Sequence, residues 1–156
     1  MVLTAAEARD FVALAHEVGI GSRAESTHAI PRSKVGVMIE VPEVTESGVI
    51  EGVIEAVDFL SIGTNDLTHY ALGKSRHIAG DGAVSGTISL AETRKPEVFE
   101  LISRVVKASK AAGKPVGICG ESASDPESAK LFIELGVDSL SASSALLPQL
   151  KAALLA

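Results

Sequence analysis

Short apolar runs alternate along the chain with segments whose apolar residues recur at helical spacing. The runs lie at 35–40, 58–63, 115–119 and 137–141, and Gly, Pro or polar residues bound each of them. Runs of this length are typical of buried parallel strands. Their alternation with helical segments predicts βαβ units and therefore an α/β fold with a parallel sheet.

The helical segments carry recognisable start and stop signals. Thr4 and Glu7 form a capping box at the start of the first helix, and Asp125-Pro126 supplies an N-cap and a first-turn proline. The segment 74–95 has no periodicity, so we expect a loop that covers a neighbouring site. Helices are predicted from Thr4 to Val18, over 45–57, over 67–73, from Pro96 to near Gly113, from Asp125 to Gly136 and over 145–155.

The composition narrows the class of protein. The chain has 156 residues, enough for one domain with a real core, and it is 46% hydrophobic but only 3% aromatic. The net charge of −6 argues against general nucleic-acid binding, and the single cysteine excludes an internal disulfide framework. Neither a membrane-spanning run nor a signal-peptide core is present, so we expect no membrane association and a cytoplasmic location.

Three of the predicted strands end on groups that carry chemistry. The first ends at Glu40, the second is followed by Asn65 and Asp66, and the third ends at Cys119. The carboxyl ends of parallel strands share one edge of a sheet, so a single site is expected there. Glu40 and Asp66 together suit either Mg²⁺ or an acid/base pair that shares a proton, and helix capping is an equally good explanation.

Other residues near this edge are open to more than one interpretation. Asn65 can bind an anion or hold a loop. Arg76 offers a planar fork suited to carboxylate or phosphate, although a loop arginine is more often simply solvated. Cys119 can be a nucleophile, a general acid or an inert core thiol, and the last is the commonest for a lone cysteine.

The residues at the strand ends resemble a known family in order and approximate spacing. The matching stretches are Val37–Pro42, Asp58–Tyr70, Gly117–Glu121 and Gly136–Ser141, together with Arg76. They are similar to the phosphoenolpyruvate (PEP)-binding domain of the PEP-utilising enzymes. The similarity is greatest to enzyme I of the sugar phosphotransferase system, a PEP–protein phosphotransferase and hence a kinase of a protein histidine.

The resemblance implies the second half of a TIM (β/α)8 barrel and a role for each site residue. Glu40 and Asp66 would bind Mg²⁺, and Asn65, Asp66 and Arg76 would bind PEP. Cys119 would donate a proton to C3 of the enolate as pyruvate forms. The phosphoryl acceptor would be a histidine on another domain or protein, because none of the four histidines here lies in a matching motif.

The chain also departs from the family pattern. Met1–Leu3 resembles the end of the fourth barrel strand, so the earlier strands and two phosphate-binding arginines are expected to be missing. Ser75 stands where the family has Asp. We therefore expect weak or no catalysis by the chain alone. Two alternatives stay open: a non-catalytic module that senses PEP or pyruvate or binds a protein, and a Mg²⁺-dependent lyase or aldolase acting on a pyruvate enolate.

A four-stranded parallel sheet raises the question of assembly. It would have two unpaired edges and one face without helices, and the Val, Ile and Leu residues of the strands are expected to alternate between that face and the helices. We therefore expect a homodimer or larger oligomer, with the strands 35–40 and 137–141 near the interface.

Overall fold

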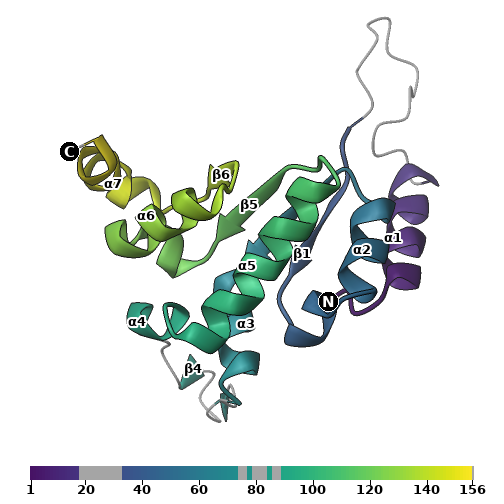
Figure 1. Ribbon diagram of the computed structural model, residues 1–156, viewed down its shortest axis with the longest axis horizontal. Helices are drawn as coiled ribbons and strands as arrows, with labels where there is room; N and C mark the ends of the chain where they lie inside the picture. Colours follow the sequence, from purple (N-terminus) through teal and green to yellow (C-terminus); the bar gives the residue numbers. More distant parts are fainter. Residues whose placement is uncertain (18–32, 74–76, 79–83, 86–88, 156) are drawn as a thin grey trace, which may run out of the picture.

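Four parallel strands form the main sheet of the protein (Figure 1). The structure is a computed structural model that describes residues 1–17, 33–73, 77–78, 84–85 and 89–155. The strands pair in the order β1-β2-β5-β6, and every neighbouring pair is parallel. Their bounds are Gly36–Ile39 for β1, Phe59–Gly63 for β2, Val116–Cys119 for β5 and Ser139–Leu140 for β6. The predicted α/β class with a parallel sheet is confirmed.

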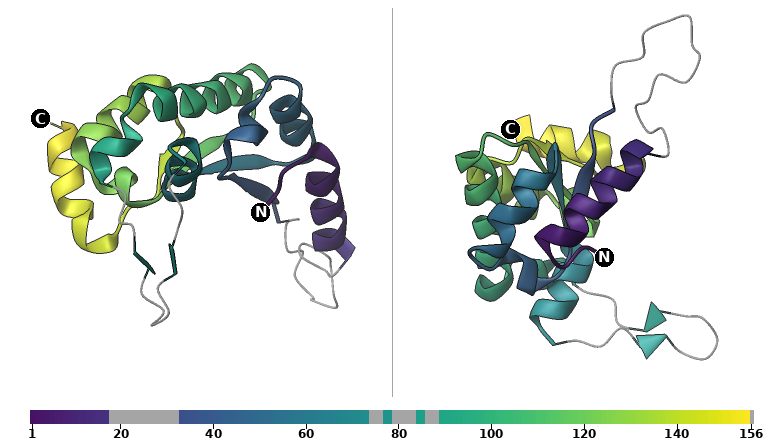
Figure 2. Two further views of the ribbon diagram at one scale, coloured as in Figure 1. Left: turned by 90° about the horizontal axis from the view of Figure 1, so that it is seen from below. Right: turned by 90° about the vertical axis from the view of Figure 1, so that its right-hand side faces the viewer.

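The helices lie along one side of this sheet and at its ends. Figure 2 shows the elements arranged as an arc, with the first and the last helix at opposite ends. Among the described residues, no helix is both long and apolar enough to cross a membrane. The helices are α1 (Ala5–Glu17), α2 (Val49–Ala56), α3 (Thr64–Ala71), α4 (Leu90–Thr93), α5 (Pro96–Ala111), α6 (Pro126–Leu135) and α7 (Leu147–Leu155), with 3₁₀ turns η1 (Pro42–Thr45), η2 (Glu121–Ser124) and η3 (Ser144–Leu146).

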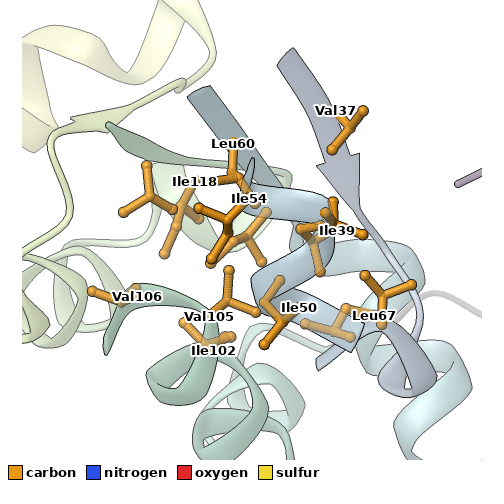
Figure 3. Packing of buried hydrophobic residues seen from close by; sticks show 14 of the residues in the cluster. Val37, Ile39, Ile50, Ile54, Leu60, Leu67, Ile102, Val105, Val106 and Ile118 are labelled. Carbon is orange, nitrogen blue, oxygen red and sulfur yellow. The ribbon is translucent and has the colours of Figure 1, made fainter. Parts of the chain in front are cut away.

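The core is a layer of aliphatic side chains between the sheet and the helices α2 and α5. Alternate residues of each strand point into this layer, and Figure 3 shows Ile39, Leu60 and Ile118 packed against Ile54 and neighbouring side chains. Each fully buried side chain of this size stabilises the fold by roughly 1.5–3 kcal/mol. The strand residues that share this face are Val37, Ile39, Leu60, Ile62, Val116 and Ile118, all 6% exposed or less.

The opposite face of the sheet differs from our expectation. The aliphatic residues do not alternate between the two faces; they all point toward the helices, because each strand places a different kind of residue at the intervening positions. The open face instead carries Met38, Phe59, Ser61 and Cys119, with glycines between them. The predicted aliphatic interior face is therefore wrong, and the open face is mixed in chemistry.

Some element boundaries also differ from the sequence-based expectation. The segment 74–95 is not wholly irregular: β3 (His77–Ile78) pairs antiparallel with β4 (Val84–Ser85), and α4 follows. Helix α4 begins with a capping box, in which the Ser89 N–H donates to Glu92 Oε2 at 3.0 Å. The helix expected over 45–57 begins only at Val49, after Gly48 with φ of 88°.

Two aspartates hold the beginnings of neighbouring strands together. The Asp58 carboxylate accepts the Val35 N–H at 2.8 Å, and the Asp58 N–H donates to the Val35 carbonyl at 2.8 Å. Asp138 makes the same pair of contacts with Val116, also at 2.8 Å each. We call these two arrangements the aspartate clasps. They join β1 to β2 and β5 to β6.

Each clasp is followed by the same close approach of a side chain to a glycine. The Phe59 ring lies over Gly36, where a Cβ would be 2.5 Å from it, and Ser139 Oγ lies over Gly117, where the distance would be 2.6 Å. The residues Val57–Ser61 and Val137–Ser141 share the pattern Val-Asp-x-Leu-Ser. The pairs β1–β2 and β5–β6 are thus built from the same local contacts.

The Asp138 clasp predicts a stability that depends on pH. A hydrogen bond from Lys110 and another from the Val116 N–H hold the pKa of Asp138 below its ordinary value of 3.8, against a smaller opposing effect of burial. A carboxylate with a lowered folded-state pKa stabilises the fold above its unfolded pKa, and this contribution is lost as the pH falls through the folded pKa.

We therefore expect Asp138→Asn to lower the free energy of unfolding at pH 7 by about 1 kcal/mol or less, because the ion pair with Lys110 is partly exposed. Asn keeps an acceptor for Val116. Urea denaturation at pH 7 and at pH 3 measures the difference from wild type, which should shrink at pH 3. Glu134→Gln, an exposed position on α6, is the control and should change neither value. A difference that persists in full at pH 3 would contradict this account.

Candidate active site at the strand ends

The ends of β1, β2 and β5 lie side by side in register. Ile39 pairs with Ile62, and Gly63 pairs with Cys119. Glu40 follows β1 and its Cγ packs against Gly63, where a Cβ would be 3.1 Å away. The side chains of Glu40 and Cys119 therefore flank Gly63 on the two neighbouring strands.

A hydrogen-bond network fixes the beginning of α3 to the end of β5. Thr64 is fully buried, and its hydroxyl donates to the Cys119 carbonyl at 2.8 Å while accepting from Ser122 Oγ at 2.7 Å. Because Thr64 is the first residue of α3, this network sets the position of Asn65 and Asp66 relative to Cys119.

Gly120 is required for this close contact. It has φ of 104°, a conformation that side chains rarely adopt, and a Cβ there would collide with the Thr64 hydroxyl. The same Cβ would be 3.0 Å from Asn65 Oδ1. The backbone after Cys119 can therefore approach α3 only as glycine.

Asn65 has a defined orientation at the site. Its Oδ1 accepts the Glu121 N–H at 3.1 Å, so the side-chain oxygen faces η2. A backbone N–H requires an acceptor, which settles which end of the amide is the oxygen. The Asn65 NH₂ group consequently remains as a donor for an anionic ligand. Asp66 follows in the first turn of α3 and is partly exposed.

The Cys119 thiol lies on the open face of the sheet, where it is partly exposed. Its Sγ is 3.5 Å from the Ile62 carbonyl oxygen, which accepts the S–H. Ser61 Oγ donates to Cys119 Sγ at 3.6 Å, and Met38 Sδ lies 3.9 Å from the same sulfur. The thiol is therefore partly accessible at the sheet surface and is not enclosed in the aliphatic core.

A cavity of about 660 Å³ lies beside these strand ends. Asn65 and Glu121, at the beginnings of α3 and η2, line it together with Leu90 and Leu146. The cavity leaves space next to Asn65 for a small anion and for a second chemical group beside that anion.

Asp125, which also lines this cavity, has a structural role. Its carboxylate accepts the Ser128 N–H at 2.9 Å as the N-cap of α6 and pairs with Arg94 at 2.5 Å. Burial raises the pKa of Asp125, but the hydrogen bonds from Ser128 and the Arg94 charge outweigh that effect and hold the pKa below 3.8. The Asp125 carboxylate thus caps α6 and, through Arg94, links that helix to the end of α4.

The carboxylates present fit Mg²⁺ better than a softer or fully protein-bound metal. Among the residues that the structure describes, no group of three His, Cys, Asp or Glu side chains could enclose a metal ion. Mg²⁺ commonly takes only one or two protein carboxylates and fills its other positions with water and substrate oxygens. Glu40 and Asp66, on neighbouring strand ends, are a donor set of that kind.

Most of the predicted site residues meet at this edge of the sheet. Glu40, Asn65, Asp66 and Cys119 all follow or end neighbouring strands, as the sequence indicated. Asn65 and Asp66 belong to the first turn of α3, however, whereas the helix was expected to begin at Leu67. Arg76 lies outside the described residues. Sequence reasoning did not single out Thr64, Ser122, Ser61 and Met38, whose roles depend on which strands pair and in which register.

Comparison with known proteins agrees with this geometry. The model of a family described as "PEP-utilising enzyme, PEP-binding domain" matches residues 1–156. The chain belongs to the PEP-utilising enzyme family. A phosphoenolpyruvate-protein phosphotransferase of Streptomyces coelicolor is 36% identical over 154 residues, which are 99% of this chain and 24% of that protein. A phosphoenolpyruvate synthase of Pyrococcus furiosus is 43% identical over 108 residues, 69% of this chain and 12% of that protein.

The chain thus spans about a quarter or less of the length of these relatives. Solved structures show the same fold at lower identity. An HpcH/HpaI aldolase from Desulfitobacterium hafniense has a TM-score of 0.61 at 22% identity and covers 97% of this chain, which matches 58% of the aldolase. A pyruvate kinase from Cryptosporidium parvum has a TM-score of 0.58, with 92% of this chain and 26% of that chain covered. These are TIM-barrel folds, so the predicted partial barrel is confirmed.

Proposed function

We propose that the chain binds PEP with Mg²⁺ and supports phosphoryl transfer from PEP to a histidine of another domain or protein, releasing pyruvate. The observation that carries this proposal is the alignment of Glu40, Asn65-Asp66 and Cys119 on three adjacent strand ends, in a chain of the PEP-utilising family. The chain covers a small part of its relatives, so it is proposed to act within a larger assembly of domains.

Each residue has a proposed task in binding. Glu40 and Asp66 would hold Mg²⁺, which when bound offsets negative charge on phosphate and enolate oxygens. Asn65 would donate its NH₂ group to the ligand, since its oxygen is occupied by Glu121. Arg76 is proposed to bind the phosphate or carboxylate of PEP, on the strength of the family resemblance.

Cys119 is proposed as the proton donor to the enolate. After the phosphoryl group leaves, the enolate of pyruvate takes a proton at C3: the new C–H bond forms, the S–H bond breaks, and its electron pair stays on sulfur. A protonated thiol next to the reacting carbon is what this step requires. The contact between the thiol and the Ile62 carbonyl supports this proposal, because it provides an acceptor for the S–H proton in the protonated state that the step requires.

The first test measures the metal and the carboxylates. Oxalate imitates the enolate, and we expect calorimetric titration to show oxalate binding only when Mg²⁺ is present. Glu40→Gln and Asp66→Asn should each weaken binding by at least about tenfold, because each removes a charged metal ligand. Glu43→Gln, an exposed position on η1, is the matched control. Unchanged binding by a folded Asp66→Asn variant would refute the metal assignment.

The second test isolates the thiol. In D₂O with Mg²⁺, the protein should exchange the methyl hydrogens of pyruvate for deuterium, which is the proton transfer in reverse. Cys119→Ala should slow exchange by about 100-fold, the effect of a lost general acid, while oxalate binding stays unchanged. Proton NMR follows the exchange. Binding without exchange in the wild-type protein would instead favour a module that senses PEP or pyruvate.

We also propose that the protein acts as a homodimer or larger oligomer, and in the cytoplasm. The remaining support for assembly is the pair of sheet edges at β1 and β6, which pair with no further strand among the residues that the structure describes. The open face is mixed in chemistry, so it does not offer the aliphatic surface that we expected to favour association. Light scattering at low micromolar concentration should give at least twice the mass of one chain; a stable, cooperatively folding monomer would overturn this proposal.

A further inference from the structure

A row of side chains crosses the open face of the sheet and ends at Cys119. Met38 projects from β1, and Ser61 from β2, toward the Cys119 sulfur on β5. Met38 reaches across an intervening strand because Gly63 has no side chain: a Cβ there would be 3.0 Å from the Met38 sulfur. Ser61 needs no such gap, since it lies on the strand that pairs directly with β5.

The hydrogen-bond contacts of the thiol have different directions. The Ile62 carbonyl at 3.5 Å and Met38 Sδ at 3.9 Å are acceptors for the thiol proton, whereas the sulfur accepts a proton from Ser61 at 3.6 Å. Sulfur is a weak acceptor as a thiol and a much stronger one as a thiolate, because hydrogen bonds to charged groups are stronger. The Ser61 contact therefore strengthens when the sulfur gains charge.

We infer that Ser61 is a positioning residue for Cys119: its hydroxyl orients the thiol and stabilises the thiolate that forms when the thiol protonates the enolate. This inference rests on the proposed function. In that step the S–H electron pair remains on sulfur, and the Ser61 O–H already points at that sulfur, so little reorganisation is needed. Water then returns a proton to the thiolate. Met38 Sδ is an acceptor for the thiol proton and supplies no donor, so it cannot stabilise the thiolate.

The single cysteine of the chain makes this inference directly measurable. Alkylation by iodoacetamide proceeds through the thiolate, and mass spectrometry follows it at one residue. Ser61→Ala should react about fivefold more slowly at pH 8, the effect of one lost hydrogen bond, and its rate–pH profile should move to higher pH. A purely structural role predicts the opposite sign, because a smaller side chain gives the reagent easier access.

Two variants serve as matched controls. Ser61→Thr keeps the hydroxyl and should react within about twofold of the wild type, on the scale of that same bond. Ser139→Ala removes a hydroxyl from the same face on β6, where it lies against Gly117, and should leave the rate unchanged. Circular dichroism establishes that each variant is folded. Faster or unchanged alkylation of a folded Ser61→Ala would overturn the inference.

The catalytic part of the inference has its own readout. Ser61→Ala should slow the deuterium exchange of pyruvate by about fivefold without changing oxalate binding, again the size of one hydrogen bond, and Ser139→Ala should change neither. Alkylation needs neither PEP nor Mg²⁺. Failure of the wild-type protein to bind oxalate would therefore refute the proposed function. The alkylation rates would still decide whether Ser61 acts on the thiol. Normal exchange by Ser61→Ala would overturn the catalytic role.

Discussion

The burial of one face of the sheet against α2 and α5 is the constraint on which the site depends. Alternate Val, Ile and Leu residues fill this layer completely, so the sheet is held without using its second face. The intervening positions are then free to carry small, polar or sulfur-containing side chains. Cys119 and Ser61 occupy such positions, and the strand ends beyond them carry Glu40 and the beginning of α3.

The strand ends add a second level of organisation, made of polar contacts. Thr64 joins α3 to the Cys119 carbonyl, and Gly120 permits the close approach that this bond requires. Asn65 continues the same connection to η2. The side chains proposed to bind the ligand are therefore attached to a rigid junction between two strands, which suits a site whose geometry must be preorganised.

Much of this arrangement follows from sequence alone, and the remainder does not for definable reasons. The four strands and the position of Glu40, Asn65, Asp66 and Cys119 at their ends follow from apolar runs and from the shared edge of parallel strands. Strand register is not encoded locally, so the contact between Ser61 and Cys119 becomes visible only in the structure. The open face differs from the expectation because the aliphatic residues occupy only one of the two alternating sets of strand positions, whereas both sets were expected to be aliphatic.

The two aspartate clasps have a consequence for how the chain folds. They join residues 23 and 22 positions apart in the sequence, so each closes a short loop that contains one strand and the connection leading to the next strand. Loop-closure entropy rises with length, so such local closures are favoured early in folding. The β1–β2 and β5–β6 pairs can then form as separate cooperative units, and the longer connection between β2 and β5 needs to close only once both exist.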